Sequence, residues 1–261
     1  MSDSDRVETN NVPGMFAASL TGERERDEDF VVCGEFGNVR VGVLCDGMGG
    51  AEDGELASQG AGMAFVEGVG SIVSKGTEEW VSQEFRHGAY AEILLECHAT
   101  VNSVAGEQGR SGTTLTALVI TLSEGTPTHA DLVHMGDSRC YRVAEGRAEI
   151  ITQDHSVTGD MLRAGYIKLH EIPETAGNNA LTRSLGDEAA SLADISTLGI
   201  SPGDSFLLCC DGVWGPLHTE AGLWLPDSPL GQQPTVEALV NEALERGSTD
   251  NCSALSIDLG A

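Results

Sequence analysis

The sequence predicts an α+β fold built from antiparallel sheets and helices. Apolar stretches typical of strands come in pairs joined by tight turns, at Gly37-Asn38 and at Glu145-Gly146, which is the pattern of β-hairpins. Segments with helical spacing come in blocks and do not alternate with single strands, which argues against a parallel sheet. The chain contains no internal repeat and no low-complexity linker, so we expect one domain over 13–261 behind a flexible polar lead at 1–12.

Local patterns predict each element in turn. Strands are expected on both sides of the Gly37-Asn38 turn within 30–45, and helices over 54–74 and 78–104, where small and apolar residues recur at helical spacing. Later in the chain we expect, in order, a strand at 115–122, a turn at 125–128, a strand at 130–135, a hairpin at 141–152, a short helix at 155–165, a mobile loop at 166–180, an irregular loop at 216–234 and a helix at 235–246. Gly247 then follows the last helix, as glycine often does at a helix end.

The chain has 261 residues and a strongly acidic net charge of -27. Binding to nucleic acid depends mainly on Lys and Arg contacts to phosphate, so this charge argues against a nucleic-acid partner and against anionic membrane surfaces. Hydrophobic residues make up 40% of the chain, which is enough to build a core. The acidic surface instead favours high solubility and contact with basic partner surfaces.

Cysteine usage and the N-terminal sequence predict a cytoplasmic protein. No CxxC pair occurs, and most cysteines lie in apolar runs, so we expect buried, reduced thiols and neither zinc binding nor disulfides. The seven cysteines are Cys33, Cys45, Cys97, Cys140, Cys209, Cys210 and Cys252. The first residues are acidic and polar, unlike a signal peptide, and no apolar stretch approaches the length of a transmembrane helix.

Four aspartates stand at the ends of apolar runs, each beside Gly or Asn: Asp46, Asp137, Asp211 and Asp250. A carboxylate at a strand tip beside a turn residue can point into a cleft shared with other tips. Like charges held close together raise each other's pKa and cost folding free energy. Divalent cations remove that cost, and sites made only of oxygen ligands select hard ions such as Mg²⁺ or Mn²⁺. Each aspartate alone has a plainer interpretation, because Asp-Gly is a common hairpin turn.

The set of motifs is more specific than any one aspartate. The chain lacks the patterns GxxxxGK[ST], GxGxxG, HExxH and GxSxG. It contains, in order, RxxDED (24–29), DGMGG (46–50), SGTT (111–114), GDSR (136–139), DHS (154–156), LTRSLG (181–186), DGVWG (211–215) and GSTDN (247–251). In this order the motifs resemble the PPM family, the PP2C-type metal-dependent protein serine/threonine phosphatases, and its bacterial members in particular. The resemblance covers nearly all of residues 14–259.

This resemblance implies both a fold and an activity. The implied fold is a β-sandwich of two antiparallel sheets flanked by helices (α-β-β-α), with a metal cleft at one end. The implied activity is hydrolysis of phosphoserine and phosphothreonine in proteins by a metal-activated water, in signalling that opposes a Ser/Thr protein kinase. Phosphorylated proteins are then the partners, and we expect a monomer. The implied cofactors are two core Mn²⁺ or Mg²⁺ ions and a weaker third ion.

The resemblance also assigns metal ligands by position. Asp46 matches the aspartate that bridges two metals, and Gly47 matches the glycine whose carbonyl ligates one of them. Asp211 and Asp250 match the remaining carboxylate ligands. Asp137 matches the aspartate that binds the third metal together with Asp211. A bridging carboxylate is the simplest device for holding two ions about 3.5–4 Å apart, the spacing of two-metal hydrolases.

Three further positions and one segment carry implied roles. Glu28 and Asp29 match acidic residues that hold metal-bound waters. Arg24 matches the arginine that grips the substrate phosphate, a role that suits a guanidinium because it forks onto two oxygens. Residues 159–180 fall where the family has its flap, beside the third metal. Arg24 and Asp46 are therefore the expected catalytic residues.

The chain departs from the family pattern in three places. Asp27 stands where Asn is usual, Met48 stands where animal members have a histidine proposed as general acid, and 213–233 replaces a stretch that is usually a plain helix. Two alternatives remain open from the residues alone. The chain could be a pseudophosphatase that binds phosphoproteins without turnover, or a dedicated phosphatase of one regulatory phosphoprotein.

Overall fold

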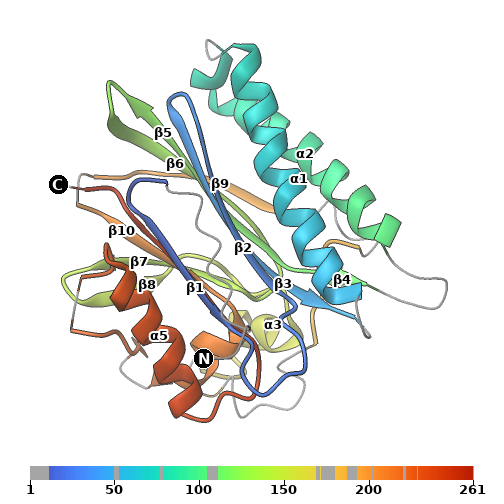
Figure 1. Cartoon of the computed structure of the whole chain (residues 1–261), viewed down its shortest axis with the longest axis vertical. Helices are drawn as coiled ribbons and strands as arrows, with labels where there is room; N and C mark the ends of the chain where they lie inside the picture. The colour runs from blue at the N-terminus through green and yellow to red at the C-terminus, as the bar shows by residue number, and fades with distance from the viewer. Residues whose placement is uncertain are drawn as a thin grey trace.

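Two antiparallel sheets packed face to face, with helices on their outer sides, make up the computed structural model (Figure 1). The structure describes residues 12–49, 53–76, 79–104, 111–168, 171, 180–186, 193–201, 203–219, 222–227 and 229–260. Residues 1–11 of the predicted lead lie outside these ranges, as do 169–170 and 172–179 of the predicted loop and flap. The predicted α-β-β-α sandwich is confirmed.

The first sheet contains, in spatial order, β1 (Met15–Leu20), β13 (Cys252–Asp258), β10 (Ser205–Cys209), β7 (Arg139–Ala144) and β8 (Arg147–Ile150). The second contains β2 (Asp29–Phe36), β3 (Val39–Met48), β5 (Leu115–Ser123), β6 (Thr126–Met135) and β9 (Asp194–Leu198), with β4 (Gly112–Thr113) paired to the end of β3. A two-stranded hairpin, β11 (His218–Thr219) and β12 (Gly222–Leu223), is separate from both sheets.

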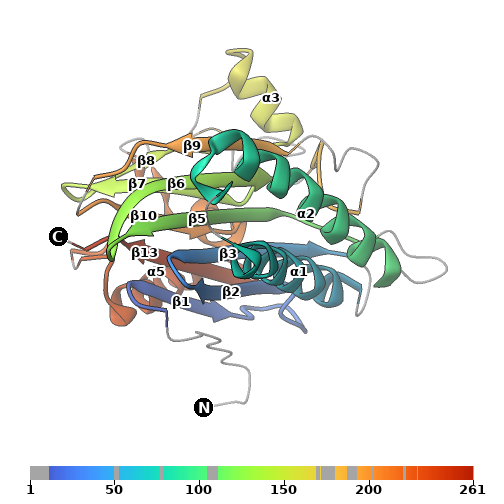
Figure 2. The same ribbon diagram turned by 90° about the horizontal axis from the view of Figure 1, so that it is seen from above.

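The helices are α1 (Asp53–Lys75), the 3₁₀ turn η1 (Glu79–Val81), α2 (Gln83–Val104), α3 (Val157–Arg163), α4 (Asp211–Leu217) and α5 (Gln233–Glu245). Helices α1 and α2 cover the outer face of the second sheet, and α5 covers the first sheet (Figure 1). Figure 2 shows α3 outside both sheets, on the side of the edge strands β8 and β9. Within the described ranges, no helix combines the length and the apolar character needed to cross a membrane.

Strand β5 shows why both faces of the second sheet are apolar. Leu118 and Ile120 belong to the core between the two sheets, whereas Ala117 and Val119 belong to the core beneath α1 and α2. Successive side chains of a strand point to opposite faces, so a strand buried on both sides reads as an unbroken apolar run. This explains why the centre of the strand, ALVI at 117–120, is apolar without alternation.

Most predicted elements are present, with differences at their ends. The predicted turn at 125–128 is wrong, because the chain turns at Glu124-Gly125, and both residues have positive φ values of 51° and 81°, as two-residue hairpins favour. The helix predicted from 78 begins at Gln83, where Ser82 caps it by accepting a hydrogen bond from the Phe85 N–H. The loop predicted from 216 is helical up to Leu217.

A buried ion pair fastens α2 to the second sheet. Arg86 is 2% exposed and Asp131 is fully buried, and the guanidinium Nε donates to Asp131 Oδ2 at 2.5 Å. Tyr90 Oη donates to the same oxygen at 2.9 Å, and Thr197 Oγ1 donates to Oδ1. Burial by itself raises the pKa of Asp131, but the hydrogen bonds from Arg86, Thr197 and Tyr90 outweigh it and lower the pKa below its ordinary value.

This pair gives a prediction about stability. Asp131→Asn leaves the Arg86 charge buried without its partner, and we expect it to lower the free energy of unfolding by about 3–5 kcal/mol. Tyr90→Phe removes one hydrogen bond and should cost about 1 kcal/mol. Urea unfolding followed by circular dichroism measures both. The exposed pair of Arg40 and Glu35 provides the control, since Glu35→Gln should change stability by less than about 1 kcal/mol. An equally small effect of Asp131→Asn would contradict this account.

Candidate metal centre

Strand ends from both sheets meet at one acidic cleft of about 280 Å³. It is lined by Arg24, Glu28, Asp46, Gly47, Met48, Gly49, Thr114, Asp137, Leu181, Asp211, Asp250 and Asn251. Every site residue predicted from the sequence lines this cleft except Asp29, which lies behind it. The structure therefore brings together residues that are more than 200 positions apart in the chain.

Asp46 reaches the cleft at the end of β3, and the SGTT motif fixes its backbone. Its N–H donates to Thr114 Oγ1 at 2.9 Å, and its carbonyl accepts from Thr114 N at 2.9 Å and from Thr113 Oγ1 at 3.0 Å. All three bonds involve the main chain. The Asp46 carboxylate thus remains free to bind a ligand in the cleft.

Gly47 follows Asp46 at a point where no side chain fits. A Cβ on Gly47 would lie 2.2 Å from the Gly54 carbonyl oxygen and 2.6 Å from that of Glu28. The Gly47 N–H donates to the Glu28 carbonyl at 3.0 Å. Glycine is therefore required at this position, because the residue before β2 and the first turn of α1 both lie against it. This close packing holds the Gly47 backbone at the wall of the cleft.

Asp137 lies in the GDSR turn that carries the chain from β6 to β7. Gly136 before it has a φ of 107°. The Gly136 carbonyl accepts from the His155 N–H at 2.7 Å, and the Gly136 N–H donates to His155 Nδ1 at 3.2 Å. On the other side, Trp214 Nε1 donates to the Asp137 carbonyl at 3.0 Å. The backbone is held from two directions, and the sequence did not predict these roles of His155 and Trp214.

Arg139 in the same motif locks Trp214 in place. Its Nε and Nη2 donate to the two carboxylate oxygens of Asp154 at 2.9 and 2.7 Å, and its guanidinium carbon lies 3.5 Å from the centre of the Trp214 ring. Arg139 is fully buried, and a planar guanidinium both forks onto a carboxylate and stacks on an aromatic ring. The GDSR, DHS and DGVWG motifs are thus parts of one packed unit behind Asp137.

Asn251 joins the Arg24 loop to the aspartates of the first sheet. Its Nδ2 donates to the carbonyls of Thr21 and Arg26 at 2.8 Å each, and its Oδ1 accepts from the Glu28 N–H at 2.9 Å. The preceding residue, Asp250, accepts a hydrogen bond from Arg24 Nη2 at 2.7 Å. Arg24 is 53% exposed, so its guanidinium stands at the rim of the cleft, open to solvent.

The carboxylates in the cleft repel one another. Desolvation, followed by repulsion from Asp29 and Asp211, raises the pKa of Asp46 well above its ordinary value. Desolvation and the Asp211 charge do the same to the pKa of Asp137, and desolvation and Asp250 raise the pKa of Asp211 to about 6. Among the lining residues Arg24 is the one cation. This set of oxygen donors fits hard divalent cations, which would relieve the repulsion.

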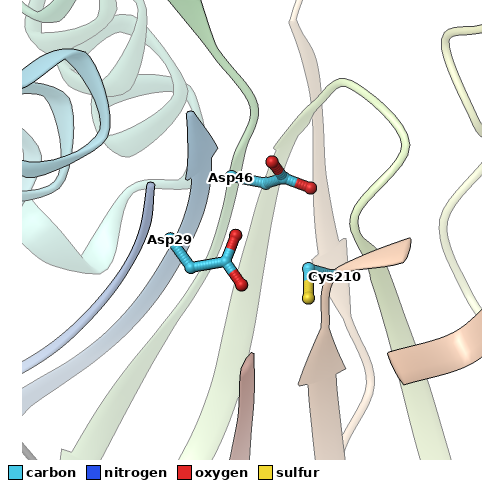
Figure 3. A group of neighbouring side chains, drawn as sticks. All are labelled: Asp29, Asp46 and Cys210. Atoms are coloured by element: carbon cyan, nitrogen blue, oxygen red, sulfur yellow. The ribbon is translucent and has the colours of Figure 1, made fainter. Parts of the chain in front are cut away.

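Asp29 lies deeper than the other predicted residues. It pairs with Asp46 across β2 and β3, and the two carboxylates and the Cys210 sulfur lie together (Figure 3), with one ligand atom of each within 4.8 Å of the others. Asp29 is 8% exposed, and its buried Oδ2 has no hydrogen-bond partner among the described residues. The sequence predicted its closeness to the cleft but not this cysteine beside it.

The raised pKa values predict how metal binding depends on pH. Below these values the folded protein carries protons that a cation must displace, so stabilisation by Mn²⁺ should grow as pH rises from about 5 to about 7. Each displaced proton accounts for about 1.4 kcal/mol per pH unit.

Thermal unfolding with and without Mn²⁺ at each pH measures that difference. The lowered pKa values of His134 and His155 also affect stability in this range, but they cancel in the comparison. Equal stabilisation at both pH values would contradict the assignment of these carboxyls as the cation ligands.

Known proteins resemble this chain over nearly its full length. A sequence profile described as Protein phosphatase 2C matches residues 21–247. Protein phosphatase PhpP of Streptococcus pneumoniae is 28% identical over 221 residues, which cover 83% of this chain and 85% of PhpP. The crystal structure of the PPM Ser-Thr phosphatase MsPP of Mycobacterium smegmatis has a TM-score of 0.71 at 29% identity, covering 94% of this chain and 98% of MsPP.

A further solved structure bears on the metals. The catalytic domain of the serine/threonine protein phosphatase PstP in complex with two manganese ions has a TM-score of 0.68 at 25% identity, covering 94% of this chain and 96% of that domain. The profile match, the two-sheet fold and the ordered motifs agree along the chain. This chain therefore belongs to the protein phosphatase 2C family.

Proposed function

We propose that this chain is a metal-dependent protein phosphatase that hydrolyses phosphoserine and phosphothreonine in proteins. The observation that carries the proposal is the meeting of Asp46, Asp137, Asp211 and Asp250 in one cleft with Arg24 at its rim. The names of its relatives as serine/threonine phosphatases support it. A pseudophosphatase is not favoured, because the ligand aspartates and the rim arginine are all present.

The residues of the cleft divide into metal ligands and supporting groups. We assign Asp46 to both core ions, the Gly47 carbonyl to one of them, and Asp211 and Asp250 as the other carboxylate ligands. Asp137 and Asp211 would hold a weaker third ion, and Glu28 and Asp29 would orient waters. Two Mn²⁺ or Mg²⁺ ions there would lower the pKa of a water and clamp the phosphoryl oxygens. The manganese ions of the PstP structure support the core pair.

Arg24 is the group that would bind the substrate phosphate. Its partner Asp250 holds the guanidinium 2.7 Å away at the mouth of the cleft, where a phosphorylated side chain would enter. A guanidinium presents paired donors that match two phosphate oxygens. Met48 also lines the cleft, and its thioether has no proton to give, so this side chain does not protonate the leaving oxygen.

The cellular setting is a further part of this proposal. We propose that the protein works as a monomer in the cytoplasm, in signalling that opposes a Ser/Thr protein kinase, with residues 13–261 as a single domain. The cysteines support a reducing compartment, because all seven are free and buried. The net charge of -27 supports substrates with basic surfaces, which an acidic enzyme attracts.

Metal removal tests the proposed function. Hydrolysis of p-nitrophenyl phosphate and of a phosphothreonine peptide should vanish in EDTA and return with Mn²⁺ or Mg²⁺. Asp46→Asn takes a charged ligand from both core ions, so we expect kcat to fall by more than about 100-fold, since even groups that only support a ligand cost 10–100-fold. Glu35→Gln, at the far hairpin, is the matched control and should retain activity. Full activity of metal-free protein would refute the proposal.

Arg24 is tested separately. Arg24→Ala should lower kcat/KM by roughly 10–100-fold, the scale of one lost charge-assisted hydrogen bond, and should weaken inhibition by inorganic phosphate. Arg24→Lys should recover only part of the loss, because an ammonium group cannot donate two parallel hydrogen bonds to the phosphate. Steady-state kinetics with phosphate as inhibitor measure both, and Arg40→Ala, on the opposite end of β3, serves as the control. Unchanged phosphate inhibition in Arg24→Ala would place Arg24 outside the substrate site.

A further inference from the structure

We propose that Asp29, Asp46 and Cys210 form a second site, for a thiophilic divalent cation such as Zn²⁺ or Cd²⁺. Because Asp46 belongs to both sites, such an ion would exclude the catalytic pair and inhibit the enzyme. The inhibitory consequence rests on the proposed function, whereas binding of the ion does not.

The three side chains come from three strand ends that face one another. Asp29 begins β2 and pairs in register with Asp46 near the end of β3, and Cys210 follows β10 of the opposite sheet. In Figure 3 the Asp29 carboxylate points across the gap toward Cys210, with Asp46 above it. The ligand atoms lie within 4.8 Å of one another. Tetrahedral zinc holds its ligand atoms about 3.5 Å apart and accepts three protein ligands with a water as the fourth, so binding would require the three side chains to rotate closer together.

The state of Asp29 points to a cation. It is 8% exposed, and its buried Oδ2 has no hydrogen-bond partner among the residues that the structure describes. A buried carboxylate oxygen without a hydrogen-bond partner costs folding free energy, and a cation shared with Asp46 would satisfy this oxygen.

The surroundings of Cys210 suit a metal thiolate. The Ser253 N–H donates to the Cys210 sulfur at 3.1 Å, and the thiol donates to the Asn251 carbonyl at 3.4 Å. When a cation replaces the thiol proton, which leaves to solvent, the Ser253 N–H remains in place to support the negative sulfur.

The sulfur separates the two classes of cation. Mg²⁺ and Mn²⁺ prefer carboxylate, carbonyl and water oxygens, whereas thiolate ligands select softer ions such as Zn²⁺. The catalytic ions would therefore use the oxygen side of Asp46, toward Asp211 and Asp250, and leave Cys210 alone. A thiophilic ion would be drawn to the opposite side, where the sulfur and Asp29 lie, and would compete with the catalytic ions for the Asp46 carboxylate.

Cadmium binding to the full chain tests the site without any assay of activity. Titration of metal-free wild-type protein with CdCl₂ should produce sulfur-to-cadmium charge-transfer absorption, which Cys210→Ser should lack. Cys209→Ser makes the same chemical change one residue earlier, at the last residue of β10 and outside the group of Asp29, Asp46 and Cys210, and should retain the band. Asp29→Asn should keep the band but weaken cadmium affinity by about 10–100-fold. Circular dichroism checks that each variant folds.

Inhibition supplies the second readout. In the presence of Mn²⁺, the Zn²⁺ concentration that halves each protein's own activity should rise by about 10-fold or more in Cys210→Ser and stay unchanged in Cys209→Ser. If Cys210→Ser does not fold, cadmium NMR of the wild type decides, because one sulfur and carboxylate oxygens give a shift distinct from oxygen ligands alone.

The outcomes are separable. A charge-transfer band that is absent from the wild type, or undiminished in Cys210→Ser, overturns the site. An all-oxygen cadmium shift does the same. Absence of phosphatase activity under every condition, with the band present and lost in Cys210→Ser, would refute the proposed function and leave the thiophilic site standing.

Discussion

Repulsion among the carboxylates of the cleft is the constraint on which the rest of the site depends. Asp46, Asp137 and Asp211 all have raised pKa values because each is desolvated near the others. A chain that holds them together must obtain its stability elsewhere, and two apolar clusters provide it, one that lies between the sheets and extends beneath α5 and one beneath α1 and α2. The cleft lies at one end of this body, where the ends of the strands reach past the packed layers.

The scaffold positions the aspartates by their main chain and leaves their carboxylates available. Thr114 holds the Asp46 peptide, Trp214 holds the Asp137 carbonyl, and Asn251 holds the loop beside Asp250. Each of these partners is neutral. A cationic partner on the carboxylate oxygens would compete with a metal, whereas a bond to the peptide fixes position without reducing the charge available to the ligand. Arg24 on Asp250 is the exception, and it stands at the exposed rim.

Patterns among neighbouring residues predicted the helices, the strands and the aspartates of the cleft. They could not predict contacts between segments that lie far apart in the chain. An Asp-Gly pair at the end of an apolar run can be recognised from about five neighbouring residues. The sequence therefore predicted that Asp46 and Asp211 lie at strand ends facing a cleft, and both line the cleft in the structure. The Asn251 bond to the Arg26 carbonyl spans 225 positions, and no periodicity encodes it. The turn at Glu124 was missed because a glutamate with positive φ is uncommon, and Cys210 was taken for core because its neighbour Asp29 approaches from the other sheet.

The cleft also lies across the junction of the two sheets, which ties metal binding to the sandwich itself. Asp46 belongs to the second sheet, Asp211 follows a strand of the first, and Asp137 lies in the turn that passes from one to the other. Cations bound by all three would therefore cross-link the sheets at their open end. Binding that requires the folded arrangement stabilises it by the same free energy, so any change in sheet spacing alters both affinity and stability. The ion pair of Arg139 and Asp154 holds together the motifs behind Asp137.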